Sequence, residues 1–372
     1  MKAAGIAGAI GALNELGRGS FGFAPIAPAQ AQSEKPVDHK IFELPSAPLQ
    51  SGVDFRNARL SYKTYGQLAS DKSNVTVVPS AYVGTHQYVD WLTSTGNILD
   101  PNRYFIISVA MLGSGLSSSP SNAVPPFDGA RYPKVTLADN VRMQQRLVTE
   151  VFGIQKIALV YGWSMGGQQA YHWGALFPDM VERICVVCGS ARTSVNNLVF
   201  LAGLEAALKA DPAWQNEWFA STPVRGLKAF ARVYAGWVLS PAFFRAEVYK
   251  SIGFTSLEDW LVRAIEAYWM PHNANDLLAQ LWSWQKADIS DNELYHGDLP
   301  MALRAIKARA LIMPCETDRY FMVEDNASEM PHLTHAELRP IPSIFGHVAA
   351  SGVGPPEDAA FIAKGVHNLL SA

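Results

Sequence analysis

The chain has 372 residues, of which 49% are hydrophobic and 17% charged, and its formal net charge is −3. This composition is typical of a globular protein with a sizeable core, and the length allows one large domain with an insertion or two ordinary domains. No basic face is visible, so we expect no nucleic-acid partner. No apolar run reaches the ~20 residues that a membrane span requires, so we expect no membrane partner.

The N-terminal stretch combines a signal-like and a leader-like pattern. "MKAAGIAGAIGAL" carries a lysine and an apolar run, and "APAQAQ" near residue 30 resembles a small-residue cleavage site. Glu15, Arg18 and several glycines separate the two features. We interpret residues 1–41 as a flexible leader of a cytoplasmic protein, while a signal peptide and export stay open as the alternative.

From residue 42 onward, strand-like and helix-like patterns alternate. Strands are expected at 58–66, 74–83, 103–111, 156–162, 181–190, 308–314 and 336–342. A Gly/Ser-rich loop, "LGSGLSSSPSN", follows the third of these strands, and a helix is expected to begin near Thr136 and Asp139, with Val151 on its apolar face. Such alternation predicts an α/β fold with a mostly parallel central sheet and helices on both faces.

The pattern changes between residues 193 and 300, where helical periodicity replaces strand signals. Seven of the ten tryptophans lie in this stretch. A helical insertion between two strands usually packs over the carboxyl edge of the sheet, where ligands bind in open α/β folds. We therefore expect an α/β core formed by residues 42–192 and 301–372 and a helical cap formed by residues 193–300.

Ser164 is the central residue of "GWSMG", a G-x-S-x-G pattern between a strand and a helix. In that context the motif forms a nucleophile elbow, a turn so tight that glycines are needed two residues before and after the serine. The following helix directs its amides and its dipole at negative charge developing beside the hydroxyl. The pattern predicts a nucleophilic serine.

A nucleophilic serine needs a base and an orienting carboxylate, which follow it in the order acid, then histidine, in sheets of this kind. His347, just after the last expected strand, is the candidate base. Asp318, four residues past Pro314, is the preferred acid because it lies in the short loop after a strand. Glu316 and Asp325 are the rival acids.

The backbone amides of Tyr82 and Met165 are the candidate oxyanion hole. Met165 follows the nucleophile, and Tyr82 lies in the loop after the second main strand, the two places from which such donors come. Each amide is expected to contribute about 3 kcal/mol to transition-state stabilisation.

We expect neither a metal nor a cofactor. Cys185 and Cys188 lie in a strand-like run and are interpreted as core residues. His332 and His335 lack a third ligand, and the "MLGSGLSSS" loop lacks the third glycine and the later acid of a dinucleotide site.

Several longer segments together resemble the homoserine O-acetyltransferase family of α/β-hydrolase-fold enzymes. The resemblance rests on "NILDPNRYFIIS", "LGSGLSSSPSN", "YPKVTLADNV", "GWSMGGQQAYHWGALFPD", "ALKADPAW" and "FGH", and it covers nearly all of residues 42–370. Within the family the chain is most similar to the esterase-type branch, which includes hydrolases of short alkyl acetates. The resemblance implies a helical-capped α/β-hydrolase fold, the Ser164, Asp318 and His347 triad, and a homodimer.

The chain also departs from the transferase pattern. Family members that act on homoserine carry an acidic residue directly after the catalytic histidine, where this chain has Val348. Arg232 matches the family's substrate-binding arginine only with a spacing that differs by one residue, and Trp163 is the second substrate-binding candidate. We therefore predict hydrolysis of small uncharged, acetyl-type esters through an acyl-serine. An acyl-CoA-dependent O-acetyltransferase and a non-catalytic binding protein stay as alternatives.

Overall fold

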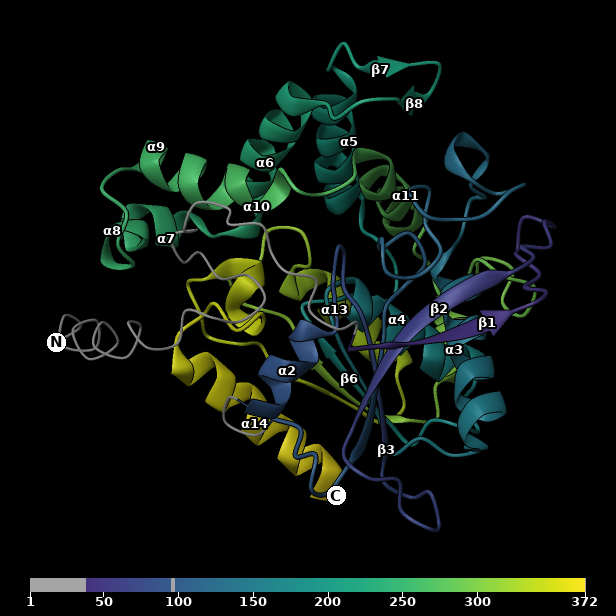
Figure 1. Cartoon of the computed structure of the whole chain (residues 1–372). Helices are drawn as coiled ribbons and strands as arrows, with labels where there is room; N and C mark the ends of the chain where they lie inside the picture. Colours follow the sequence, from purple (N-terminus) through teal and green to yellow (C-terminus); the bar gives the residue numbers. More distant parts are fainter. Residues whose placement is uncertain (1–37, 95–97, 372) are drawn as a thin grey trace, which may run out of the picture.

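The computed structural model describes residues 38–94 and 98–371, so most of the leader predicted over 1–41 lies outside the described residues. Its main element is an eight-stranded sheet with the order β1-β2-β4-β3-β5-β6-β9-β10 (Figure 1). Antiparallel pairing joins β1 to β2 and β2 to β4, and all other neighbours are parallel. The strands are β1 (Lys40–Leu44), β2 (Ala58–Tyr65), β3 (Val75–Pro79), β4 (Phe105–Val109), β5 (Leu159–Trp163), β6 (Arg183–Val187), β9 (Arg309–Met313) and β10 (Ala336–Leu338).

The central strands are buried along their whole length because helices cover both faces of the sheet. Every residue of β3, β4 and β5 is buried, which is the pattern of a parallel sheet with two covered faces. One hydrophobic cluster joins α2 and α14 to the sheet, and a second joins α3, α4 and α12 to it. These core helices are α2 (Gln87–Ser94), α3 (Leu137–Arg146), α4 (Met165–Leu176), α12 (Leu299–Ala305), α13 (Val323–Glu329) and α14 (Pro356–Ser371).

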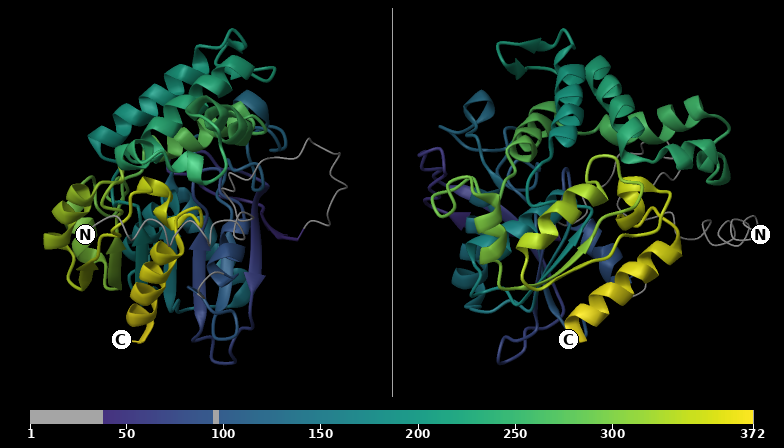
Figure 2. Two further views of the ribbon diagram at one scale, coloured as in Figure 1. Left: turned by 90° about the vertical axis from the view of Figure 1, so that its left-hand side faces the viewer. Right: turned by 180° about the vertical axis from the view of Figure 1, so that it is seen from behind.

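Helices inserted between β6 and β9 lie over one end of the sheet, above the carboxyl end of β5 (Figures 1 and 2). They are α5 (Val195–Lys209), α6 (Val224–Val238), α7 (Pro241–Arg245), α8 (Val248–Ser251), α9 (Leu257–Trp260), α10 (Ala267–Trp269) and α11 (Ala274–Gln285). A two-stranded hairpin of β7 (Trp214–Gln215) and β8 (Trp218–Phe219) lies between α5 and α6 in the chain. The boundaries 193 and 300 for the cap stay a proposal. Throughout the described ranges, helices of the length and apolarity that a bilayer crossing demands are lacking.

Several local expectations differ from the structure. Residues 40 and 41, which were expected to belong to the flexible leader, are part of strand β1 and pair with β2. The strand expected at 74–83 ends at Pro79, and residues 80–83 form a loop instead. Thr136 begins α3 with a capping box to Asp139, as expected, but Val151 is 43% exposed rather than part of the apolar face. The reason is a π-helical segment (Leu147–Val151) at the end of α3, which changes the periodicity on which the expectation rested.

Candidate active site

Ser164 forms a strained turn between β5 and α4. Its φ and ψ are 60° and −128°, and its amide donates to the carbonyl of Val187 at 2.9 Å. A Cβ on Gly162 would lie 2.0 Å from the Gly166 oxygen, and one on Gly166 would lie 2.6 Å from the Pro79 oxygen. Both glycines are therefore required by close backbone packing, as expected of a nucleophile elbow.

Asp318 and His347 meet although 29 positions separate them. The His347 Nδ1 donates to Asp318 Oδ2 at 2.7 Å, and both side chains are almost completely buried. The other oxygen, Oδ1, accepts from the amides of Tyr320 at 3.1 Å and Phe321 at 3.2 Å. The carboxylate is thus held from both sides, which fixes the Nδ1–H tautomer and leaves Nε2 as the basic nitrogen.

Neither rival acid occupies the position of Asp318. Glu316 is exposed, and Asp325 lies on α13. Asp318 lies in the loop after β9, and His347 lies in the short 3₁₀ segment Gly346–Ala350 beyond β10.

Aromatic rings fix the imidazole of His347 beside the elbow. The ring centroid of Tyr320 lies 4.4 Å from that of His347, and that of Trp163 lies 5.2 Å away. The Trp163 Nε1 also donates to the His347 carbonyl at 3.2 Å. Because Trp163 directly precedes Ser164, these contacts place His347 against the residue next to Ser164 in the chain. No hydrogen bond within the described residues joins the Ser164 hydroxyl to His347, so that bond stays a prediction.

The two candidate oxyanion donors come from segments that Gln169 ties together. The Gln169 Nε2 donates to the carbonyl of Ser80 at 2.9 Å and to that of Met165 at 3.3 Å. The amide of Met165 lies at the start of α4, where helical amides have no intrahelical acceptor. The amide of Tyr82 has no acceptor in the part of the chain that the structure describes. Sequence reasoning missed Gln169, since a glutamine on a helix carries no motif.

A buried thiol, that of Cys188, lies close to Asp318 and His347. Donor atoms of Cys188, Asp318 and His347 lie within 4.8 Å of one another, and among the described residues this is the group with metal-ligand character. Burial raises the pKa of the Cys188 thiol well above its usual value, with a further contribution from the Asp318 charge. The thiol is therefore protonated, and Asp318 and His347 already bond each other.

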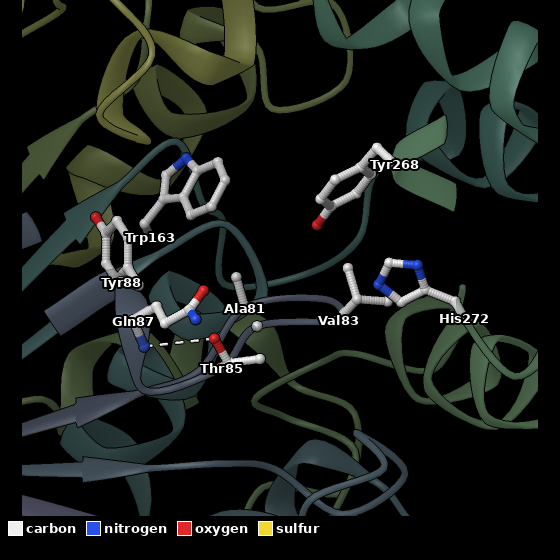
Figure 3. A pocket seen from close by; sticks show the side chains of 9 residues that line it. Ala81, Val83, Thr85, Gln87, Tyr88, Trp163, Tyr268 and His272 are labelled. Atoms are coloured by element: carbon white, nitrogen blue, oxygen red, sulfur yellow. Dashed lines mark hydrogen bonds between the residues drawn. The ribbon is translucent and has the colours of Figure 1, made fainter. Parts of the chain in front are cut away.

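A cavity of about 210 Å³ lies between the core and the cap, with Trp163 in its wall (Figure 3). Tyr268 and His272 of the cap face it from the side opposite to Trp163 and Tyr88. Burial lowers the pKa of His272, so its ring is neutral at pH 7. The cavity is lined by Ala81, Val83, Gly84, Thr85, Gln87, Tyr88, Trp163, Tyr268 and His272.

Arg232 is not part of this arrangement. It lies on α6, where its guanidinium contacts Glu266 at 2.6 Å and also Glu258. These two carboxylates raise its pKa, so the guanidinium is a paired surface cation. Its role in substrate binding stays a prediction that the described geometry does not support.

Comparison with known proteins places this geometry in a family. Residues 84–330 match the family described as the alpha/beta hydrolase fold. The chain belongs to the alpha/beta hydrolase family. This hydrolase-family chain is 38% identical to the ethyl acetate hydrolase of Pseudomonas veronii, over 85% of its own length and 91% of that protein. The predicted fold class and the predicted family are therefore confirmed.

Two further relatives show the breadth of the family. The crystal structure of an acetylester hydrolase from Corynebacterium glutamicum has a TM-score of 0.85 and 33% identity, with 90% of this chain and 96% of that chain covered. The homoserine O-acetyltransferase of Thermobifida fusca is 32% identical over 54% of this chain and 58% of that protein. The esterase relatives thus match over a longer part of the chain.

Proposed function

We propose that this chain hydrolyses short-chain acetyl esters through an acyl-serine intermediate. Ser164 is the nucleophile, His347 the base and Asp318 the orienting carboxylate. The predicted class of enzyme, a carboxylic ester hydrolase, is confirmed by relatives named as hydrolases of acetyl esters. The observation that carries the proposed residue roles is the buried 2.7 Å contact of Asp318 and His347 beside the strained Ser164 turn.

The reaction has two halves, each with proton transfer through His347. In the first, Nε2 takes the Ser164 proton while Oγ attacks the ester carbonyl, and the resulting oxyanion binds the amides of Tyr82 and Met165. Collapse of the tetrahedral species releases the alcohol, which receives the proton from His347. In the second half, water activated by the same nitrogen attacks the acyl-serine and releases the acid.

The volume of the cavity beside Trp163 supports the proposal of a small substrate. Drug-sized ligands occupy pockets of about 300–1,000 Å³, whereas the cavity beside Trp163 measures about 210 Å³. Its wall contains the apolar faces of Trp163, Tyr88 and Val83, with no carboxylate among its lining residues. A short neutral ester fits this surface better than a zwitterion, because unpaired charges are costly to bury.

The second candidate function is transfer of an acetyl group from acetyl-CoA to a small alcohol. It is supported by the homoserine O-acetyltransferase relative and shares all the proposed catalytic residues. The residue after His347 argues against homoserine as acceptor, because Val348 is apolar and 1% exposed and offers no charge to an ammonium group.

The test uses purified protein with p-nitrophenyl acetate and ethyl acetate, and separately with acetyl-CoA and small alcohols including homoserine. We expect ester hydrolysis, and a loss of kcat of about 10⁴-fold or more in Ser164→Ala. Ser190→Ala is the matched control, because Ser190 is a buried serine after β6 whose hydroxyl donates to the Arg192 carbonyl. Thiol release that depends on the acceptor alcohol would establish the transferase instead.

We further propose a homodimer and a cytoplasmic location. The homodimer is supported by the outer face of α5, where Val195 is 77% and Val199 is 63% exposed. Light scattering of the purified protein measures its oligomeric state, and cell fractionation measures its location in the cell. A monomer at micromolar concentration would contradict the dimer.

A further inference from the structure

Gln280 on the cap helix α11 bonds two loops of the core at once. Its Oε1 accepts from the Val83 amide at 2.8 Å, and its Nε2 donates to the Gly113 carbonyl at 2.7 Å. The side chain is 1% exposed. Gly113 permits this approach, because a Cβ there would lie 3.1 Å from the Gln280 Cγ. All four hydrogen-bonding groups are therefore buried and paired.

The Val83 peptide is held in a conformation that valine avoids. Its φ is +50°, in the left-handed region, where a β-branched side chain is a steric outlier. Such a conformation persists only when surrounding contacts impose it. The bond from the Val83 amide to Gln280 is one such contact, and it comes from the cap rather than from the loop itself.

The same bond decides which amide is left for the substrate. Tyr82 and Val83 are consecutive, and Gln280 takes the Val83 amide. The Tyr82 amide has no acceptor within the described ranges. The Tyr82 side chain is fixed as well, since its hydroxyl donates to the Leu277 carbonyl at 3.0 Å, one turn before Gln280 on α11.

A second residue fixes α11 to the core. Asp276 accepts from the Ser121 amide at 2.9 Å and from its hydroxyl at 2.6 Å. Both Gly113 and Ser121 belong to the Gly/Ser-rich loop after β4. That loop therefore fixes the position of α11 through hydrogen bonds, and α11 in turn bonds residues 82 and 83.

We propose that Gln280 is a positioning residue that holds the Val83 peptide in place, so that the Tyr82 amide binds the oxyanion of the tetrahedral intermediate. The inference rests on the proposed function, because it assigns a task to one of the proposed oxyanion donors. Gln280 itself touches no reacting atom.

The variant Gln280→Met keeps the length of the side chain and removes both hydrogen bonds. With p-nitrophenyl acetate we expect kcat to fall between tenfold and the about 100-fold that a 1 Å misplacement costs, while KM changes less than threefold. The Ki of 1,1,1-trifluoroacetone, whose adduct with Ser164 carries an oxyanion, is expected to rise by the factor by which kcat/KM falls.

Asn275→Ala is the matched control. Asn275 is also a buried carboxamide on α11 and bonds the backbone of Phe219 twice, at 3.1 and 3.0 Å, but within the cap. We expect its kcat and its Ki for trifluoroacetone to stay within threefold of the wild-type values. If Gln280→Met does not fold, Gln280→Leu is measured in the same way, because leucine also removes both hydrogen bonds and leaves no space for a water in their place.

A Gln280 variant with kcat within threefold of wild type would overturn the inference, and so would an equal loss in Asn275→Ala. Either result with an inactive Ser164→Ala would leave the proposed function intact. An active Ser164→Ala would instead overturn the proposed function.

Discussion

Asp318→Asn exchanges one carboxylate oxygen of the proposed triad for an NH₂ group, and the structure predicts which way the new amide will face. Oδ1 of Asp318 accepts from the amides of Tyr320 and Phe321. In the variant, only the amide oxygen can accept those two bonds. The NH₂ group must then take the place of Oδ2, 2.7 Å from His347 Nδ1, where it donates instead of accepting.

This reversal moves the imidazole proton to the wrong nitrogen. Nδ1 has to accept from the NH₂ group of the substituted side chain, so Nε2 carries the hydrogen and cannot remove the Ser164 proton. In serine enzymes with this arrangement the same exchange lowers kcat about 10⁴-fold. At 1.36 kcal/mol for each factor of ten, the lost transition-state stabilisation is about 5 kcal/mol.

The assay is steady-state hydrolysis of p-nitrophenyl acetate at pH 7.5, with the melting temperature measured in parallel. Glu316→Gln is the control, because Glu316 is an exposed carboxylate on the same loop. We expect the control to keep its kcat within twofold. A kcat of Asp318→Asn within tenfold of wild type, at an unchanged melting temperature, would refute the reasoning.

Three further predictions concern stability and substrate size. Burial raises the pKa of Glu329 from 4.5 to about 7, so the folded state binds the proton more tightly than the unfolded state does. The free energy of unfolding should therefore fall by up to about 3 kcal/mol as the pH rises from about 4.5 to 7. Urea unfolding at several pH values should show this decrease, and Glu329→Gln should reduce it. Gly162→Ala should abolish folding, because its Cβ would lie 2.0 Å from the Gly166 oxygen. Gly236→Ala, whose Cβ would meet nothing within 4 Å, should instead raise the free energy of unfolding by about 0.5–1 kcal/mol. Equal melting temperatures of the two variants would contradict both expectations. The value of kcat/KM should fall about tenfold or more from acetate to hexanoate esters. His272→Ala enlarges the cavity and should reduce this preference for acetate. If the variant kept the wild-type ratio of the two kcat/KM values, the cavity would be excluded as the acyl site.

The elements whose sequence carries a local physical cause could be predicted. The buried strands read as apolar runs, Thr136 with Asp139 marks a helix start, and the glycines around Ser164 mark a turn that nothing larger fits. The loop position of Asp318 was sufficient to prefer it over its rivals as the partner of His347. Its catalytic role stays a prediction, as do the roles of Tyr82, Met165 and Trp163.

The rest depends on contacts between residues far apart in the chain. Gln280 and Val83 are 197 positions apart, and no spacing rule joins a helical glutamine to a loop amide. We could not predict either that the Gly/Ser-rich loop after β4 bonds α11, because these bonds depend on where Asp276 and Gln280 lie in the folded protein. The strand expected through residues 80–83 was wrong as well, because the chain turns there, with the Gly84 amide bonded to the Ala81 carbonyl and the Val83 amide bonded to Gln280 of the cap.

The bonds that α11 makes with the two core loops have a consequence for protein engineering. A chimera that takes its helical lid from another esterase would also lose the partners of Val83, Gly113 and Ser121. Grafts that keep Asp276 and Gln280 at their places, or that transplant both loops together with the lid, should therefore hydrolyse esters far better than a lid exchanged alone.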